Sequence, residues 1–174
     1  NAALWRGVYA KKLDIILPKA FKDRTTSERI AFGVQDLLID NNGITGVFYG
    51  ENLLPIDKGS ASGWKFSVDS IRLALEANHL TRAGFGGKIG LPITKIETNG
   101  TTRNKLLEYS AIITPGSGYL CRVITKDSLD FDLWKAKVIL QPNSYIQLAG
   151  NEDGLKPEAM LHGTMGIVAR SMGT

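Results

Sequence analysis

Apolar and polar residues alternate over many short stretches of the chain, with the two-residue period of a half-buried β-strand. The alternation is clearest in residues 30–34, 64–68 and 134–140, where every second side chain is apolar. The apolar run at residues 119–124 is also typical of a strand. This pattern predicts a β-rich chain built from many short strands.

Turn sequences separate the expected strands. Residues 40–43 read Asp-Asn-Asn-Gly, residues 99–100 read Asn-Gly, and residues 115–118 read Pro-Gly-Ser-Gly. Asn-Gly between two β-capable runs is a strong hairpin signal, because both residues tolerate a positive φ. The spacing of strands and turns is typical of sandwiches and barrels. We therefore expect an all-β or β-rich fold, an antiparallel two-sheet sandwich or barrel with at most one or two short helices.

Two segments fit a helix as well as a strand. In residues 27–38 the apolar positions match both periods, and we favour a strand. Residues 70–80 have high helix propensity, but their apolar residues also alternate, so both interpretations stay open. Residues 57–63 are rich in Gly and Ser and predict a flexible internal loop in a single domain over residues 1–174. The chain begins without Met, so we expect a processed mature chain or part of a longer one.

Glycine accounts for 19 of the 174 residues and recurs in Gly-x-x-Gly motifs at residues 43–46, 84–87 and 163–166. Glycine adopts positive φ angles without steric cost and is therefore frequent in tight turns. We interpret the three motifs as tight connections between strands. Such a pattern favours a structural scaffold over a catalytic cleft.

Charge and cysteine content exclude several function classes. The formal net charge is +4 and the pI is about 9.2, with Lys and Arg spread along the chain. A nucleic-acid interface has a denser basic stripe, so nucleic acid is not an expected partner. No apolar run is long enough for a membrane-spanning helix. Cys121 is the only cysteine, which excludes an intrachain disulfide, and its apolar surroundings in the sequence predict a small buried residue.

Residues 84–89, Gly-Phe-Gly-Gly-Lys-Ile, resemble the Gly-x-x-Gly loop with which KH domains clamp nucleic-acid phosphates. A helix over residues 70–80 would fit the element that precedes this loop in the family. The family places another helix after the loop, where Gly90 and Pro92 would break one here. The resemblance ends at these residues, and the chain is not assigned to the family.

The sequence contains few candidate metal or acid–base sites. Asp40, Asn42 and Glu51 fall at positions one, three and twelve of a calcium loop, but Thr45 replaces the glycine that such a loop needs at position six. We therefore expect a turn at residues 40–43.

Two acidic residues and two histidines complete the set of candidates. Asp130 and Asp132 would share one side of a strand, and we interpret them as part of a polar strand face. His79 and His162 have no metal-ligand spacing and are interpreted as surface or hydrogen-bonded histidines. We expect no catalysis, no cofactor, no metal site and no small-molecule substrate.

The expected partner-binding surface contains Trp64, Trp134, Lys135 and Lys137. The two tryptophans follow polar segments, so we expect them to be partly exposed. The two lysines alternate with apolar residues, which favours a strand near a sheet edge, where Lys discourages pairing with other chains.

These observations predict a non-catalytic structural or binding module of a larger assembly, such as a pilus, adhesin, capsid or tail component. Its partners would be other proteins or copies of itself, and its location extracytoplasmic or particle-associated. Two alternatives stay open. One is a β-barrel or β-groove module that binds an apolar ligand or lipid. The other is a hydrolase in which His79 or His162 works with a distant carboxylate.

Overall fold

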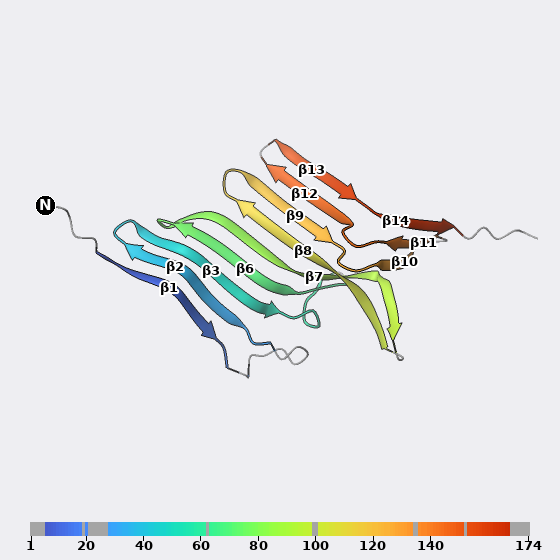
Figure 1. Cartoon of the computed structure of the whole chain (residues 1–174), viewed down its shortest axis with the longest axis horizontal. Coiled ribbons are helices and arrows are strands. Elements are labelled where there is room, and N and C mark those ends of the chain that lie inside the picture. Colours follow the sequence, from blue (N-terminus) through green and yellow to red (C-terminus); the bar gives the residue numbers. More distant parts are fainter. Residues whose placement is uncertain are drawn as a thin grey trace, which may run out of the picture.

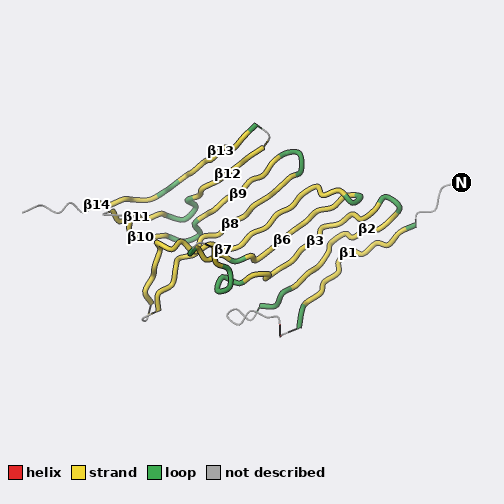
Figure 2. The backbone as a smooth tube through the Cα atoms, turned by 180° about the vertical axis from the view of Figure 1, so that it is seen from behind, coloured by secondary structure: helices red, strands yellow, loops and turns green. Residues whose placement is uncertain are grey.

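The computed structural model consists of β-strands joined by short turns (Figure 1). It describes residues 6–18, 20, 28–61, 63–98, 101–133, 136–151 and 153–167, and only the backbone of residues 61, 91–98, 101–104 and 133. This part of the chain contains no α-helix (Figure 2), and hence no helix of the length and apolarity that crossing a membrane requires. The described strands are β1 (Gly7–Ile16), β2 (Ala31–Asp40), β3 (Gly43–Leu54), β4 (Ser60–Ala61), β5 (Trp64–Phe66), β6 (Val68–Glu76), β7 (His79–Thr98), β8 (Thr101–Thr114), β9 (Gly118–Ile124), β10 (Leu129–Leu133), β11 (Ala136–Leu140), β12 (Tyr145–Asn151), β13 (Gly154–Met160) and β14 (Gly163–Ile167).

The paired strands form two antiparallel sheets. The large sheet has the order β1-β2-β3-β6-β7-β8-β9-β12-β13, and β4 and β5 join it beside β7. The small sheet has the order β10-β11-β14. The expected all-β, antiparallel, two-sheet architecture is therefore confirmed for the described residues. The segment at residues 57–63 includes β4, which pairs with β5.

The small sheet continues three strands of the large sheet beyond a break in the ladder. Neighbours β9, β12 and β13 in the large sheet lead directly into, or follow directly from, β10, β11 and β14 in the small one. The strand order is the same on both sides of the break, as Figure 1 shows near the C-terminal end of the sheet. The connections between the two sheets are only a few residues long, so they fix the position of the small sheet.

A hydrogen-bonded cluster closes this break. Thr125 Oγ1 donates to the carbonyl of Gln141 at 2.9 Å, and Ser144 Oγ lies 2.9 Å from the same carbonyl. The backbone N–H of His162 donates to Ser144 Oγ at 3.0 Å. Ser144 and Thr125 are 1% and 5% exposed, so these bonds satisfy groups that water does not reach.

The expected turns are present where the structure describes them. The backbone N–H of Asn42 donates to Asp40 Oδ1 at 2.8 Å, which confirms a turn at residues 40–43 in place of a calcium loop. The N–H of Ser117 donates to the carbonyl of Thr114 at 2.9 Å and closes the β8–β9 turn. β7 and β8 pair as an antiparallel hairpin up to Thr98 and Thr101, and the predicted Asn-Gly turn between them lies outside the described residues.

Both ambiguous segments are strands. β2 confirms the strand favoured for residues 27–38 from Ala31 onward, and β6 and β7 replace the helix that residues 70–80 could have formed. Between β6 and β7, Ala77 and Asn78 form a two-residue turn with φ angles of 47° and 68°. Pairing with neighbouring strands determines that these segments are strands, because each of them has a neighbour on both sides in the large sheet.

All three Gly-x-x-Gly motifs were interpreted wrongly as connections between strands, and residues 43–46 lie inside β3. Residues 84–87 lie inside β7, and residues 163–166 lie inside β14. At two of these positions glycine allows another backbone segment to approach closely. A Cβ on Gly87 would overlap the backbone carbonyl of Ser67, and one on Gly163 would overlap the carbonyl of Ile139. The KH-like loop and its flanking helices are therefore absent from the fold.

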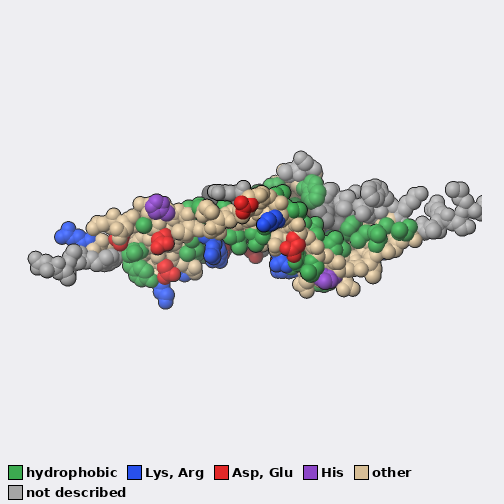
Figure 3. All heavy atoms as spheres, turned by 90° about the horizontal axis from the view of Figure 1, so that it is seen from above, with side chains coloured by type: hydrophobic (Ala, Val, Ile, Leu, Met, Phe, Trp, Pro, Cys, Tyr) green, Lys and Arg blue, Asp and Glu red, His purple; other side chains and the backbone are tan. Residues whose placement is uncertain are grey.

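The small sheet adjoins the large sheet at one end only, and the molecule is a thin slab when seen from above (Figure 3). Among the described apolar residues, only Val34, Ala111 and Leu129 are less than 9% exposed. Leu129 lies where the two sheets meet. A chain of this size normally buries a larger core, so much of the apolar surface of the described residues is left uncovered by the rest of the described chain.

Candidate functional site

One face of the large sheet is apolar across all nine strands of its main path. Residues that pair across strands share a face, so the strand registers define two rows of partners that run from β1 to β13. The first row is Leu13, Val34, Phe48, Leu73, Ala83, Ile113, Tyr119, Gly150 and Leu155. The second row is Ile15, Phe32, Gly50, Ile71, Phe85, Ala111, Cys121, Leu148 and Pro157. We call these two rows the apolar face.

The apolar face remains accessible from edge to centre. Ile15 at the β1 edge is 65% exposed, and Leu155 at the β13 edge is 55% exposed. Phe85, in the middle of the sheet, is still 40% exposed. Monomeric proteins rarely expose a contiguous apolar surface of this extent, and such surfaces mark sites of interaction. The apolar face is therefore the main candidate for a functional surface.

The opposite face carries the charged and polar side chains. Tyr49 donates its hydroxyl hydrogen to the carboxylate of Asp14, and the Arg72 guanidinium lies 5.9 Å from the centroid of the Tyr49 ring. Lys12 Nζ lies 2.9 Å from Asp14 Oδ2. The hydrogen bond from Tyr49, and then the one from Lys12, hold the pKa of Asp14 below its usual value, and the bond to Asp14 raises the pKa of Tyr49.

A second cluster on the polar face lies at the other end of the sheet. The Arg122 guanidinium stacks 4.0 Å from the centroid of the Tyr145 ring, and the Tyr145 hydroxyl donates to Glu158 Oε1 at 2.7 Å. This bond raises the pKa of Tyr145. The two faces therefore differ in chemistry: one carries paired charges in water, and the other exposes aliphatic and aromatic groups.

An apolar cavity of about 400 Å³ lies at the end of the apolar face, where the large sheet meets the small sheet. Ile89, Leu107 and Val123 line it from the large sheet, and Leu129 and Phe131 line it from β10. Its volume falls within the range of small-molecule sites. Its lining offers few polar groups, because the hydroxyls of Thr125 and Ser144 are engaged in the cluster at the break.

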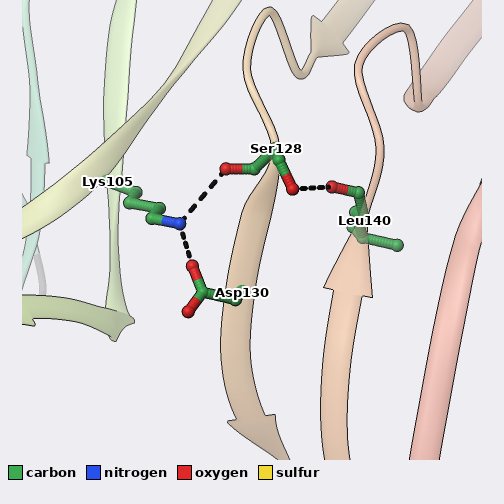
Figure 4. Close-up of polar contacts among 4 residues, drawn as sticks. All are labelled: Lys105, Ser128, Asp130 and Leu140. Atoms are coloured by element: carbon green, nitrogen blue, oxygen red, sulfur yellow. Dashed lines mark hydrogen bonds and ion pairs between the residues drawn. The ribbon is translucent and has the colours of Figure 1, made fainter.

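An ion pair connects the large sheet to the small sheet beside this cavity (Figure 4). Lys105 on β8 pairs with the Asp130 carboxylate on β10, and its Nζ donates to the carbonyl of Ser128 at 3.1 Å. The Ser128 hydroxyl donates in turn to the carbonyl of Leu140 at 3.3 Å. These contacts connect β8, β10 and β11 around the cavity.

The two candidate acidic residues, Asp130 and Asp132, each lie beside a lysine. Asp130 is engaged by Lys105, and Asp132 lies opposite Lys137 on the neighbouring strand β11. The interpretation of the two aspartates as a polar strand face agrees with these contacts. Among the described residues there is no group of three His, Cys, Asp or Glu side chains that could hold a metal ion.

The histidines are in separate parts of the fold. His79 begins β7 after the Ala77–Asn78 turn. The backbone of His162 belongs to the cluster at the break between the sheets. Cys121 is a free thiol on the apolar face and is partly exposed, so the expectation of a buried cysteine is wrong.

The structure describes two of the four residues expected to form the partner-binding surface, Trp64 and Lys137. Trp64 is 42% exposed and lines the apolar cavity. Lys137 is exposed on β11, while Trp134 and Lys135 lie outside the described residues. β11 is the central strand of the small sheet, so the expectation of an edge strand there is wrong. Lys137 faces water from a central strand, which the sequence does not distinguish from an edge.

The apolar face itself was missed by sequence reasoning. Each strand showed its own alternation, but the registers that align these apolar positions on one side come only from the fold. Comparisons of the chain with protein-family models, with curated proteins and with solved structures found no match.

Proposed function

We propose that this chain is a non-catalytic structural module of a larger protein assembly, in which the apolar face is buried against another protein surface. The apolar face carries this proposal. It runs across nine hydrogen-bonded strands, and residues as far apart as Ile15 and Leu155 remain more than half exposed. A pilus, adhesin, capsid or tail-type particle would supply the covering surface.

The energy available from covering this face is large enough to drive association. Complete burial of a Leu, Ile or Phe side chain contributes about 1.5–3 kcal/mol. Phe32, Leu73, Phe85 and Ile113 are each about two fifths exposed, so covering them contributes on the order of 1 kcal/mol each. With the other side chains of the face, this sum offsets the 4–15 kcal/mol that association is estimated to cost.

Light scattering of the native chain over a concentration series tests this proposal in its simplest form, self-association. We expect a molar mass that rises to multiples of 18.9 kDa. We also expect less binding of an apolar fluorescent dye per chain at high concentration, because the apolar face is then covered. A strict monomer that binds the dye equally at all concentrations would contradict self-association as the way in which the face is covered.

The cavity favours a second candidate function, the binding of a small apolar ligand such as a fatty acyl chain. Val123 and Leu107 line the cavity, so Val123→Phe would occupy space that a ligand needs. We expect this variant to weaken binding of a dansyl-labelled fatty acid at least tenfold. Ile112→Phe, which changes an exposed residue on the polar face, is the control. Equal binding by native chain and both variants, or none, would remove the candidate.

A further inference from the structure

Strand β1 is an open edge with a regular hydrogen-bonding pattern. The N–H of Leu17 donates to the carbonyl of Ile30 at 2.9 Å, which shows that Leu17 points its backbone groups toward the β2 side. Because these directions alternate along an antiparallel ladder, the N–H and C=O groups of Lys12, Asp14 and Ile16 point away from β2. No described strand pairs with them.

The two ends of the large sheet differ in their ability to add a strand. β13, at the far end, contains Pro157, which has no N–H to donate to a further strand. β1 contains no proline and is exposed along its length. Edge strands of this kind are templates for pairing with another chain.

The charges of β1 are complementary to those of β1 itself when it is reversed. We propose that two copies of this chain pair through β1, antiparallel and with a two-fold axis at Leu13, to form one continuous sheet. In this register Lys12 lies opposite the partner's Asp14, and Asp14 opposite the partner's Lys12. Both residues point their free backbone groups outward, so the register matches charge and hydrogen bonding together.

The neighbouring registers are disfavoured by the same side chains. A shift by one hydrogen-bonded step in one direction puts Lys12 opposite the partner's Lys12. A shift in the other direction puts Asp14 opposite the partner's Asp14. Like charges directly opposite each other destabilise a strand pair. The Lys-x-Asp sequence of β1 therefore selects a single symmetric register.

This pairing extends the apolar face across the seam. Leu13 belongs to the apolar face and is 51% exposed, and in the paired sheet it contacts the partner's Leu13. Both apolar faces then lie on the same side. The inference goes beyond the proposed function and does not depend on it, because the pairing uses the backbone edge of β1 and leaves the apolar face of each copy open.

Charge reversal tests the pairing with a built-in control. Lys12→Asp puts acidic residues at both positions 12 and 14, and Asp14→Lys puts basic residues at both, so each variant repels its own copies across the seam. We expect the dissociation constant of the dimer to rise about tenfold or more for each variant alone. An equimolar mixture of the two is expected to restore dimers, all of them mixed. The intrachain pair of Lys12 and Asp14 is lost in both chains, so restoration reports the contact between chains.

Disulfide trapping tests the register. In a chain with Cys121→Ser, Leu13→Cys places two thiols in directly opposed positions, whose Cα separation suits a disulfide. We expect a cross-linked dimer under mild oxidation. In the same background, Ile15→Cys lies about 13 Å from the partner's equivalent residue, four positions along the strand, and is expected to stay uncross-linked. The two substitutions change similarly exposed residues on the same strand.

Three results would overturn the pairing through β1. The native chain stays monomeric, the mixture of charge variants fails to restore dimers, or Leu13→Cys and Ile15→Cys cross-link to the same extent. A dimer that is unaffected by both charge variants uses another surface. That result would refute the β1 seam and leave burial of the apolar face standing, so failures of the two proposals are distinguishable.

Discussion

The hydroxyl of Tyr49 reaches the carboxylate of Asp14 across the whole width of the intervening strand β2. The two residues are both register partners of Gly33, which has no side chain to stand between them. Tyr49 therefore connects three strands at the β1 end of the sheet through a hydrogen bond that secondary structure alone does not supply.

Gly33→Ala is expected to break this contact. A Cβ at Gly33 would lie 2.5 Å from Tyr49 Cζ and 2.7 Å from Asp14 Oδ1, closer than carbon atoms approach without displacement. We expect a loss of about 1 kcal/mol in the free energy of unfolding, measured by urea denaturation. In a Tyr49→Ala background the same change should cost much less. An equal cost in both backgrounds would show that the glycine serves another purpose.

The stability of the chain should depend on the ionisation of Asp14. Its pKa is lowered in the folded state by Tyr49 and Lys12, so its contribution to stability is present above the unfolded pKa of about 3.9 and is lost as the pH falls through the folded pKa. The pKa of Tyr49 is raised, so its contribution is present below about pH 10 and is lost as the pH rises through its folded pKa.

Urea denaturation of the native chain and of Asp14→Asn, from pH 2 to pH 7, measures how much of the stability depends on the ionisation of Asp14. We expect the native chain to be more stable at neutral pH, and the difference to shrink as the pH falls below about 4. A difference that is constant over this range would contradict the role given to the Asp14 carboxylate.

The fold class and many turns were predictable because they depend on local chemistry. Asp40 and Asn42 form the expected turn with hydrogen bonds inside the turn itself. Residues 70–80 were ambiguous because Ile71 and Leu73 satisfy either period, and only pairing with β3 and β7 makes them a strand. The glycines at residues 84–87 were misread because Gly87 is needed for its close approach to the backbone carbonyl of Ser67, just before β6, and not for a turn conformation.

The candidate site was less predictable than the fold. An apolar residue such as Phe85 or Ile113 is expected in the core of a β protein, and nothing in its own segment indicates that it stays exposed. Exposure depends on whether another layer covers that side of the sheet. In the described part of the chain, only β10 and β11 place side chains beside that face, where they line the cavity.

Ser144→Ala is expected to destabilise the break between the two sheets. The Ser144 hydroxyl accepts the N–H of His162 and lies within hydrogen-bond distance of the carbonyl of Gln141, at 1% exposure of the residue. Removing it leaves buried partners unsatisfied, at a cost of about 1–3 kcal/mol. Ser128→Ala removes an exposed hydroxyl with a 3.3 Å contact and should cost less than about 0.5 kcal/mol. Chemical denaturation of both variants checks the ranking, and equal costs would contradict it.

Ala77→Gly should stabilise the β6–β7 turn. Ala77 has a φ of 47°, a left-handed conformation in which a Cβ is unfavourable and glycine is not. The turn itself is held by the Ala77 N–H, which donates to Thr45 Oγ1 at 3.0 Å, and glycine keeps that N–H. We expect a gain of about 0.5–1 kcal/mol in the free energy of unfolding. A loss would show that the turn does not adopt this conformation in solution.

Adjacent residues on β8 allow the most direct test of the role of the apolar face. Ile113 lies on the apolar face and Ile112 on the polar face, and their exposed fractions are 43% and 44%. Ile113→Lys and Ile112→Lys therefore make the same chemical change at equal exposure on opposite sides of one strand. The measurement is molar mass by light scattering over a concentration series, with circular dichroism to verify that both variants keep their strands. Our account predicts that Ile113→Lys lowers association and Ile112→Lys leaves it at the native level; equal association of the two variants would contradict it.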